Sequence, residues 1–271
     1  MNLFTPEEMV RNYSLAGAKK TQAPAWKLLI LGILAGALIG YAALVTNMAC
    51  YKLENPSMIR VLSGVLFGFG LGMVILSGAE LFTGNTLITI SVLDRRASVQ
   101  GMLRNWGLVF LGNFLGALLL SFLAARFNFF GAGGGALAEY TMNLAQAKMT
   151  MRFENALVMG ILCNILVVLA VLFSLAGKDG ASRIMGAWAP VALFTICGFN
   201  HCIADMTYCM SGLFCTRYYA GHAGAFSALG WGRYFAGNLL PVTIGNIIGG
   251  CAVGVTMWLC FLWKGKKEEK A

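Results

Sequence analysis

Polar residues that could do chemistry inside a membrane gather in one apolar stretch, WAPVALFTICGFNHCIADMTYCMSG, at positions 188–212. Its centre holds Gly198, Asn200, His201 and Asp205. A bilayer core excludes amide, imidazole and carboxylate groups unless they line a cavity or take part in function. We therefore interpret the stretch as a transmembrane helix that breaks near Gly198, with one of the chain's two histidines at the break.

An imidazole at this place could exchange protons with a small solute, because histidine ordinarily titrates near neutral pH. A proton-exchanging His201 would suit a solute that is the conjugate base of a weak acid, since a neutral acid enters an apolar constriction far more easily than an anion does. The alternative is a structural histidine that only pins the helix break. Only the proton-exchange interpretation requires a cavity that reaches the residue.

Composition defines the class of protein. The chain has 271 residues, of which 58% are hydrophobic and 11% are charged, and its mean hydropathy is +0.73. Such a chain is an integral membrane protein, and apolar segments longer than 18 residues favour helices over barrel strands. The net charge of +9 comes from Lys and Arg at segment ends, so the expected partner is the lipid bilayer and no nucleic acid.

No enzyme motif is present. The sequence has no Walker loop, no HExxH and no CxxC pair, so we expect no enzyme activity, no cofactor and no metal. The eight cysteines are scattered through apolar segments and are expected to be free thiols.

The apolar pattern predicts six spans, of which the second and fifth are interrupted. The spans lie at about 27–49, 58–93, 105–125, 154–176, 188–212 and 236–263. The expected organisation is an N-terminal amphipathic helix (1–26), a first repeat (27–127), a connecting loop (128–153), a second repeat (154–263) and a basic tail (264–271).

An even number of spans places both termini on one side of the membrane. Thirteen of the 20 Lys and Arg residues fall on that side. Because loops on the cytoplasmic side carry the excess of positive charge, we predict cytoplasmic termini in a bacterial-type inner membrane.

An internal repeat relates the two halves. The pattern N-x6-G-N-x-x-G occurs in the third span at Asn105–Gly116 and in the sixth span at Asn238–Gly249. GILAG at 32–36 likewise matches GILCN at 160–164. Three spans per copy is an odd number, so the copies must insert in opposite senses and form an inverted repeat. Matching interrupted segments in the two halves of such a protein indicate its transport site.

Taken together, these motifs resemble the formate/nitrite transporter family, which includes hydrosulfide channels. The matching residues are AELFTGNT (79–86), NW…GN (105–113), K…F…GILCN (148–164), GFNHCIADM (198–206) and NLLPVTIGNIIGG (238–250). They cover nearly the whole chain in family order and spacing. The resemblance implies an all-α, aquaporin-like fold in a homopentamer, with a pore for a small monovalent anion in each protomer.

The resemblance also implies a pathway for the anion. His201 would be the central pore histidine, close to Thr83 of the broken second span. Lys148 and Asn164 match family positions that draw the anion inward. Asn200 stands where many members have glutamate, and Asp205 where many have asparagine. No relay through a carboxylate at position 200 is therefore expected in this chain.

Two apolar constrictions follow from the same resemblance. Phe67 and Phe194 would form the outer one. Leu71, Leu81 and Phe82 would form the inner one.

The sequence thus predicts a channel or secondary transporter for formate, nitrite or hydrosulfide, with Lys148 concentrating the anion and His201 exchanging a proton with it. An aquaporin-like facilitator of water or small neutral solutes is the alternative, although the two breaks lack paired Asn-Pro-Ala boxes. A structural subunit of a redox complex is a third possibility, against which the missing haem-type histidine pairs argue.

Overall fold

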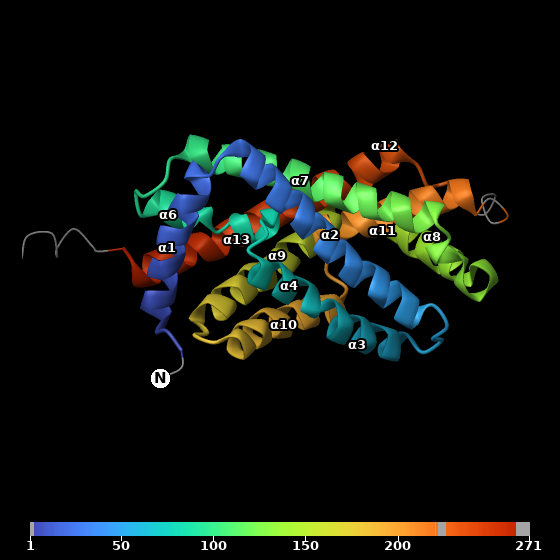
Figure 1. The fold of residues 1–271 in the computed structure, drawn as a ribbon, viewed down its shortest axis with the longest axis horizontal. Helices are drawn as coiled ribbons and strands as arrows, with labels where there is room; N and C mark the ends of the chain where they lie inside the picture. The colour runs from blue at the N-terminus through green and yellow to red at the C-terminus, as the bar shows by residue number, and fades with distance from the viewer. Residues whose placement is uncertain (1–2, 220, 222–225, 264–271) are drawn as a thin grey trace, which may run out of the picture.

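The computed structural model describes residues 3–219, 221 and 226–263, and it is almost entirely helical (Figure 1). Within these ranges six helical segments are long and apolar enough to cross a membrane. They are α2 (Ala25–Cys50), α3 with α4 (Pro56–Phe67 and Phe69–Ser77), α7 (Val99–Arg126), α9 (Phe153–Ala176), α10 (Gly180–Cys197) and the run from α12 to α13 (Trp231–Phe261). Six spans, two of them broken, agree with the sequence prediction. The basic tail predicted at 264–271 lies outside the described residues.

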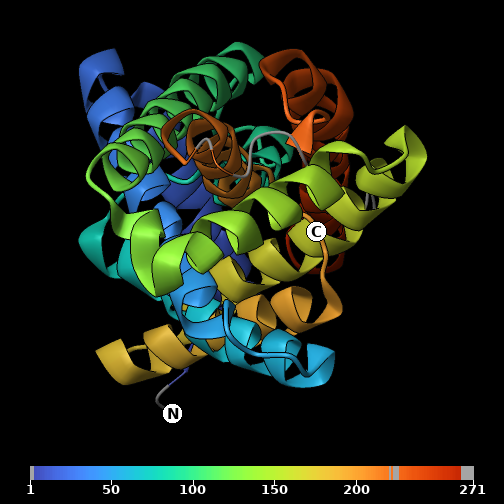
Figure 2. The same cartoon turned by 90° about the vertical axis from the view of Figure 1, so that its right-hand side faces the viewer.

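The remaining helices complete the two breaks and cover the ends of the spans. They are α1 (Pro6–Gln22), α5 (Phe82–Asn85), α6 (Ile88–Leu93), η1 (Phe129–Gly135), α8 (Ala136–Met149) and α11 (Cys202–Tyr218). The last span is built from α12 (Trp231–Arg233), the π-helical turn η3 (Tyr234–Leu239) and α13 (Leu240–Phe261). α1 lies across one end of the molecule and α8 lies at the other (Figure 1). Figure 2 shows the molecule from the end at which α8 lies.

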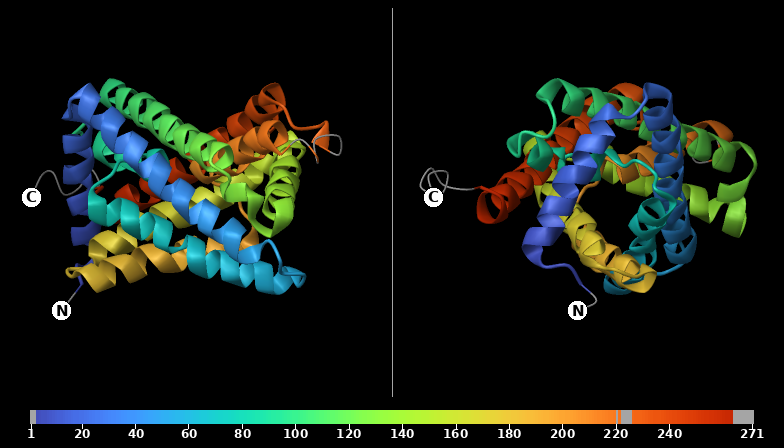
Figure 3. Two further views of the ribbon diagram at one scale, coloured as in Figure 1. Left: turned by 45° about the vertical axis from the view of Figure 1, so that its right-hand side comes forward. Right: turned by 60° about the vertical axis from the view of Figure 1, so that its left-hand side comes forward.

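Helix α1 begins at a capping box. The Thr5 hydroxyl accepts from the Glu8 backbone N–H, and the Glu8 carboxylate accepts from the Thr5 backbone N–H at 2.8 Å. That second hydrogen bond stabilises the charged carboxylate and lowers the pKa of Glu8 below its ordinary value. The box explains why the helix starts at Pro6 and then runs across the span ends (Figure 3).

Close glycine contacts hold the spans together in two matching pairs. α2 packs along α7 in the first half, and α9 packs along α13 in the second (Figure 3). A Cβ added to Gly116 would overlap the backbone oxygen of Ile33, and one added to Gly249 would overlap that of Ile161. Small residues at these crossings let the helix backbones approach closely, which is a common way for helices to associate inside a membrane.

The two breaks have the same backbone geometry. Gly78 ends α4 with φ +69°, and Gly198 ends α10 with φ +75°, a conformation that L side chains rarely adopt. After each glycine the backbone becomes extended, at Leu81 in the first break and at His201 in the second. The break predicted near Gly198 is therefore confirmed, and the interruption predicted in the second span lies after Gly78.

A buried asparagine clamps each break. Asn113 Oδ1 accepts from the Phe82 backbone N–H at 3.0 Å, and its Nδ2 donates to the backbone oxygens of Gly32 and Glu80 at 2.8 and 2.9 Å. Asn246 makes the equivalent contacts with the Cys202 N–H (2.9 Å), the Gly160 oxygen (2.8 Å) and the Asn200 oxygen (3.1 Å). The N-x6-G-N-x-x-G repeat thus places one clamp in each half, and it explains why both copies keep the asparagine.

The structure differs from the sequence prediction in the segment between the halves. The 128–153 region is not only a connecting loop, because it contains η1 and the 14-residue helix α8. α8 packs on α11 as α1 packs on α6, so the two helices occupy matching positions in the inverted halves. The fifth span also begins earlier than position 188, because the Asp179 side chain accepts from the Ser182 N–H at 2.9 Å and caps α10 there. Hydrogen bonds from Ser182 lower the pKa of that carboxyl.

Candidate functional site

Two cavities reach the broken spans, and each is lined by a different set of residues. The Lys148 vestibule has a volume of about 360 Å³, and its walls include Lys148, Asn200, His201, Asp205, Phe67 and Phe194. The Lys20 vestibule has a volume of about 220 Å³, and its walls include Lys20, Glu80, Asn85, Leu71, Leu81 and Gly84. Each vestibule therefore has one lysine, one carboxylate and the polar residues of one break.

His201 lies where the break meets α11, and both ring nitrogens are engaged. Nδ1 accepts from the Ala204 backbone N–H at 3.1 Å, which makes the imidazole the N-cap of α11. Nε2 lies 2.7 Å from the Thr83 hydroxyl, so the two broken spans meet through this pair. Since Nδ1 accepts a hydrogen bond, we assign the neutral tautomer with the proton on Nε2, donating to Thr83.

Two aromatic rings line the Lys148 vestibule beside His201. Phe67 and Phe194 lie edge to face with ring centroids 6.1 Å apart, and the Phe194 ring stacks on the imidazole at 5.9 Å. Leu71 and Leu81 line the other vestibule and are both buried. His201 therefore lies beside an aromatic pair, while a leucine pair lines the opposite vestibule.

The Phe82 ring packs against helix α7. Its ring packs against Phe110 at 5.0 Å and Trp106 at 6.2 Å, both on α7. It is not among the residues that line either vestibule. The Phe82 backbone N–H donates to Asn113 Oδ1 and so helps to hold the break, while the side chain packs against α7.

Asn164 connects the first break to the sixth span. It is fully buried in α9, and its Nδ2 donates to the Thr83 oxygen (3.3 Å), the Thr86 hydroxyl (3.1 Å) and the Asn246 oxygen (2.6 Å). It lines neither vestibule. The geometry makes it a tie between the first break and the clamp of the second.

A polar cluster surrounds Lys148, which lies in the last turn of α8. Its Nζ donates to Asn200 Oδ1 at 2.9 Å and pairs with Asp205 Oδ1 at 2.5 Å. The other carboxylate oxygen of Asp205 accepts from Asn238 Nδ2 at 3.1 Å. We call Lys148, Asn200, Asp205 and Asn238 the Lys148 cluster.

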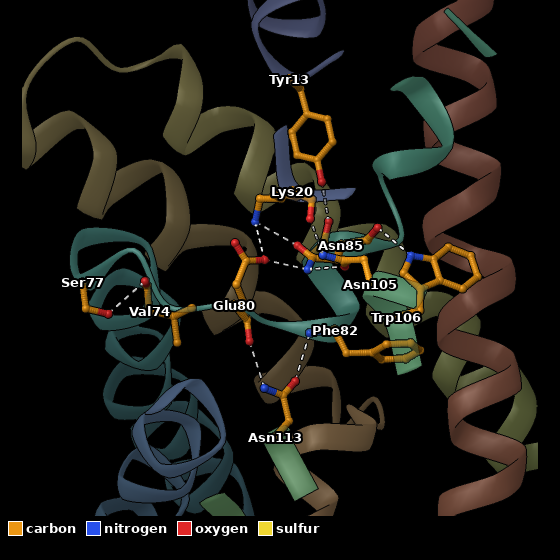
Figure 4. A network of polar contacts seen from close by, with 11 residues as sticks. Tyr13, Lys20, Val74, Ser77, Glu80, Phe82, Asn85, Asn105, Trp106 and Asn113 are labelled. Atoms are coloured by element: carbon orange, nitrogen blue, oxygen red, sulfur yellow. Dashed lines mark hydrogen bonds and ion pairs between the residues drawn. The ribbon is translucent and has the colours of Figure 1, made fainter. Parts of the chain in front are cut away.

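The equivalent cluster in the first half surrounds Lys20, in the last turn of α1 (Figure 4). Lys20 Nζ donates to Glu80 Oε2 at 2.8 Å and to Asn85 Oδ1 at 2.9 Å. Asn85 Nδ2 in turn donates to Asn105 Oδ1 at 2.9 Å. We call Lys20, Glu80, Asn85 and Asn105 the Lys20 cluster.

Sequence reasoning missed Lys20 as a site residue and treated it as part of a basic collar. A signal was present, because Lys20 precedes Gly32 by twelve residues and Lys148 precedes Gly160 by twelve. Sequence reasoning also missed Arg60, an exposed cation on α3 that lines the Lys148 vestibule and donates to the Ile196 backbone oxygen at 3.2 Å. Within the described residues no group of three His, Cys, Asp or Glu side chains could hold a metal ion.

These features define a class of protein. A six-span bundle of two inverted halves, whose broken spans meet between two vestibules that each contain a lysine, is a membrane transport protein.

The chain belongs to the formate/nitrite transporter family, whose sequence profile matches residues 7–260. It is 34% identical to the uncharacterized transporter YrhG of Bacillus subtilis, over 98% of this chain and 96% of that protein. It is 31% identical to the formate channel FocA of Escherichia coli K12, over 96% of this chain and 95% of the channel. Among solved structures, a pentameric formate channel with formate bound matches with a TM-score of 0.78 and 31% identity, covering 88% of this chain and 98% of that chain. The resemblance inferred from the motifs is confirmed, and the family is one of anion channels and transporters.

Proposed function

We propose that this protein moves a small monovalent weak-acid anion, formate, nitrite or hydrosulfide, across a bacterial cytoplasmic membrane as a homopentamer with cytoplasmic termini. The observation that supports this most is the His201–Thr83 pair, held at 2.7 Å between the two vestibules. The relatives named as formate channels and the pentameric neighbour support the substrate class and the assembly.

The positive charge of Lys148 attracts the anion into the vestibule. Lys148 is mostly buried at the inner part of its vestibule, with Arg60 nearer the exposed surface. Positive charge in a low-dielectric cleft raises the local concentration of anions. The same charge opposes protonation of the bound anion, so Lys148 attracts the substrate and does not supply its proton.

The apolar side chains around the pathway explain why the anion must take up a proton before it crosses. Moving a bare carboxylate into an apolar medium costs on the order of tens of kcal/mol in the idealised limit, whereas the neutral acid has only its polar groups to desolvate. The aromatic pair and the leucine pair are apolar barriers of this kind. The substrate therefore crosses them as the neutral acid.

His201 accounts for the proton exchange. The resting imidazole is neutral, and a second proton can bind only at Nδ1, which costs the cap hydrogen bond to Ala204. An anion beside the ring offsets part of that cost by its charge. The imidazolium, which took its second proton from water on the side where the anion entered, gives a proton to the anion and returns to the capped neutral state. One proton therefore crosses with each anion.

The test is transport by the wild-type protein in liposomes. Formate, nitrite and hydrosulfide are compared side by side, each with and without an inward proton gradient, and water permeability is measured on the same vesicles. We expect saturable anion uptake that an inward proton gradient stimulates, with water permeability at the level of empty vesicles. Fast water permeation without anion uptake would instead establish the aquaporin-like alternative.

A further inference from the structure

The two lysine clusters contain the same groups in a different order. In each, a lysine contacts one carboxylate and one amide on a broken span, and a second asparagine from another span contacts the residue seven positions after the glycine of the break. In the Lys20 cluster the carboxylate is Glu80, inside the break, and the amide is Asn85. In the Lys148 cluster the amide is Asn200, inside the break, and the carboxylate is Asp205.

The exchange changes how deeply the negative charge lies. The Glu80 side chain is 10% exposed and belongs to the extended segment that lines its vestibule. The Asp205 side chain is 1% exposed, one helical turn into α11, and both of its oxygens are occupied by Lys148 and Asn238. Both carboxylates line their vestibules, but that of Asp205, in the Lys148 vestibule, is the less exposed of the two.

Hydrogen-bond donors remain directed at that cavity. Asn200 Oδ1 is taken by Lys148, while its Nδ2 contacts only the weak acceptor Met151 Sδ, at 3.4 Å, so a second amide hydrogen has no protein partner among the described residues. The Lys148 ammonium has three donors, of which Asn200 and Asp205 take two, and it lies 5.4 Å from the centre of the Tyr208 ring.

We propose that Lys148 and Asn200 form an anion subsite, and that Asp205 is a positioning residue whose buried carboxylate, held by Lys148 and Asn238, repels the anion less than an exposed carboxylate would. Glu80 presents its carboxylate to the cavity on the opposite side. The protein therefore binds anions more tightly in the Lys148 vestibule than in the Lys20 vestibule. This inference rests on the proposed function only for the identity of the anion, a small carboxylate of the size of formate.

Charge-exchange variants test the proposal. N200E/D205N moves the carboxylate into the second break and keeps the net charge and the set of polar groups. E80N/N85D makes the opposite exchange in the first break. E154Q removes an exposed carboxylate at the start of α9, outside both clusters, and serves as the control.

Binding is measured first, by line broadening of ¹³C-formate with the full chain in detergent, because this readout does not require transport. A carboxylate moved to within several ångströms of the bound anion should weaken formate binding about tenfold at the effective dielectric of a partly hydrated site. The single variant N200E, which keeps Asp205, should weaken it further, and adding D205N should restore part of the loss. E80N/N85D should increase the bound fraction, and E154Q should leave it unchanged.

Transport measurements distinguish a weaker anion subsite from a general disturbance of the structure. In liposomes N200E/D205N should raise the half-saturating formate concentration on the Lys148 side about tenfold and keep the maximal flux within about twofold. Wild-type-like binding in N200E/D205N, or no recovery when D205N is added to N200E, would overturn the proposal. If N200E/D205N does not assemble, E80N/N85D decides alone, and unchanged or weaker binding in that variant overturns it. A wild type that binds formate but does not transport it would refute the proposed function and leave the subsite intact.

Discussion

A His201→Phe variant should lose proton-stimulated formate uptake by at least about 100-fold, the range in which a positioned proton-exchanging group acts. Phenylalanine keeps an aromatic ring beside Phe194, so the apolar constriction stays closed to the bare anion. It removes both the proton site and the contact with Thr83. Uptake is measured in liposomes at equal protein content, with an inward proton gradient.

A second variant separates the loss of the proton site from the loss of the helix cap. Phenylalanine cannot accept from Ala204, and loss of an N-cap costs about 1 kcal/mol. His201→Asn keeps a capping side chain but cannot be protonated. We expect it to assemble with near-wild-type thermal stability and to lose the response to a proton gradient as His201→Phe does. A proton response of wild-type size in His201→Asn would contradict the assigned role.

A Gly116→Ala variant should fail to assemble or should melt far below the wild type. The added Cβ would overlap the Ile33 backbone oxygen and lie 2.9 Å from the Ala37 nitrogen, and backbone atoms cannot move aside as a flexible side chain can. Overpacking a close helix contact costs about 1–3 kcal/mol and sometimes more, and here it would also displace the neighbouring Asn113 clamp. Thermal unfolding and size-exclusion profiles in detergent provide the measurement.

The matched control is Gly107→Ala on the same helix, where an added Cβ meets nothing within 4 Å. It should be neutral or stabilising by about 0.5–1 kcal/mol, because alanine is the better helix former. Gly249→Ala, the position equivalent to Gly116 in the other half, should repeat the loss. Equal melting temperatures for Gly116→Ala and Gly107→Ala would show that the α2–α7 contact does not depend on close approach.

Much of the fold could be predicted because the deciding residues are local or repeated. A glycine followed by polar groups inside an apolar run predicted each break, and the structure gives Gly78 and Gly198 positive φ angles. The spacing of Asn113 and Asn246 predicted the inverted halves. Helix α8 was not predicted, since a glycine-rich start and an even mixture of polar and apolar residues hide its periodicity.

Side-chain directions at the site were harder to predict. Whether Phe82 faces the pathway or α7 depends on which neighbour has room for the ring, and Trp106 and Phe110 provide it. Asn164 belongs to a matching motif, yet its partners come from two other spans and cannot be read along the chain. Lys20 lies on a helix that looks like a surface collar until α1 is seen packed under the first break.

The measurement that tests the central claim most directly is the ratio of protons to formate ions that enter together. A pH-sensitive dye inside liposomes and ¹⁴C-formate give the two fluxes in one experiment on the wild-type protein, with the membrane potential clamped to zero. If the substrate passes the His201–Thr83 pair as the neutral acid, the ratio is one and uptake is insensitive to membrane potential. Formate entry without protons, carrying a current that follows the membrane potential, would contradict it.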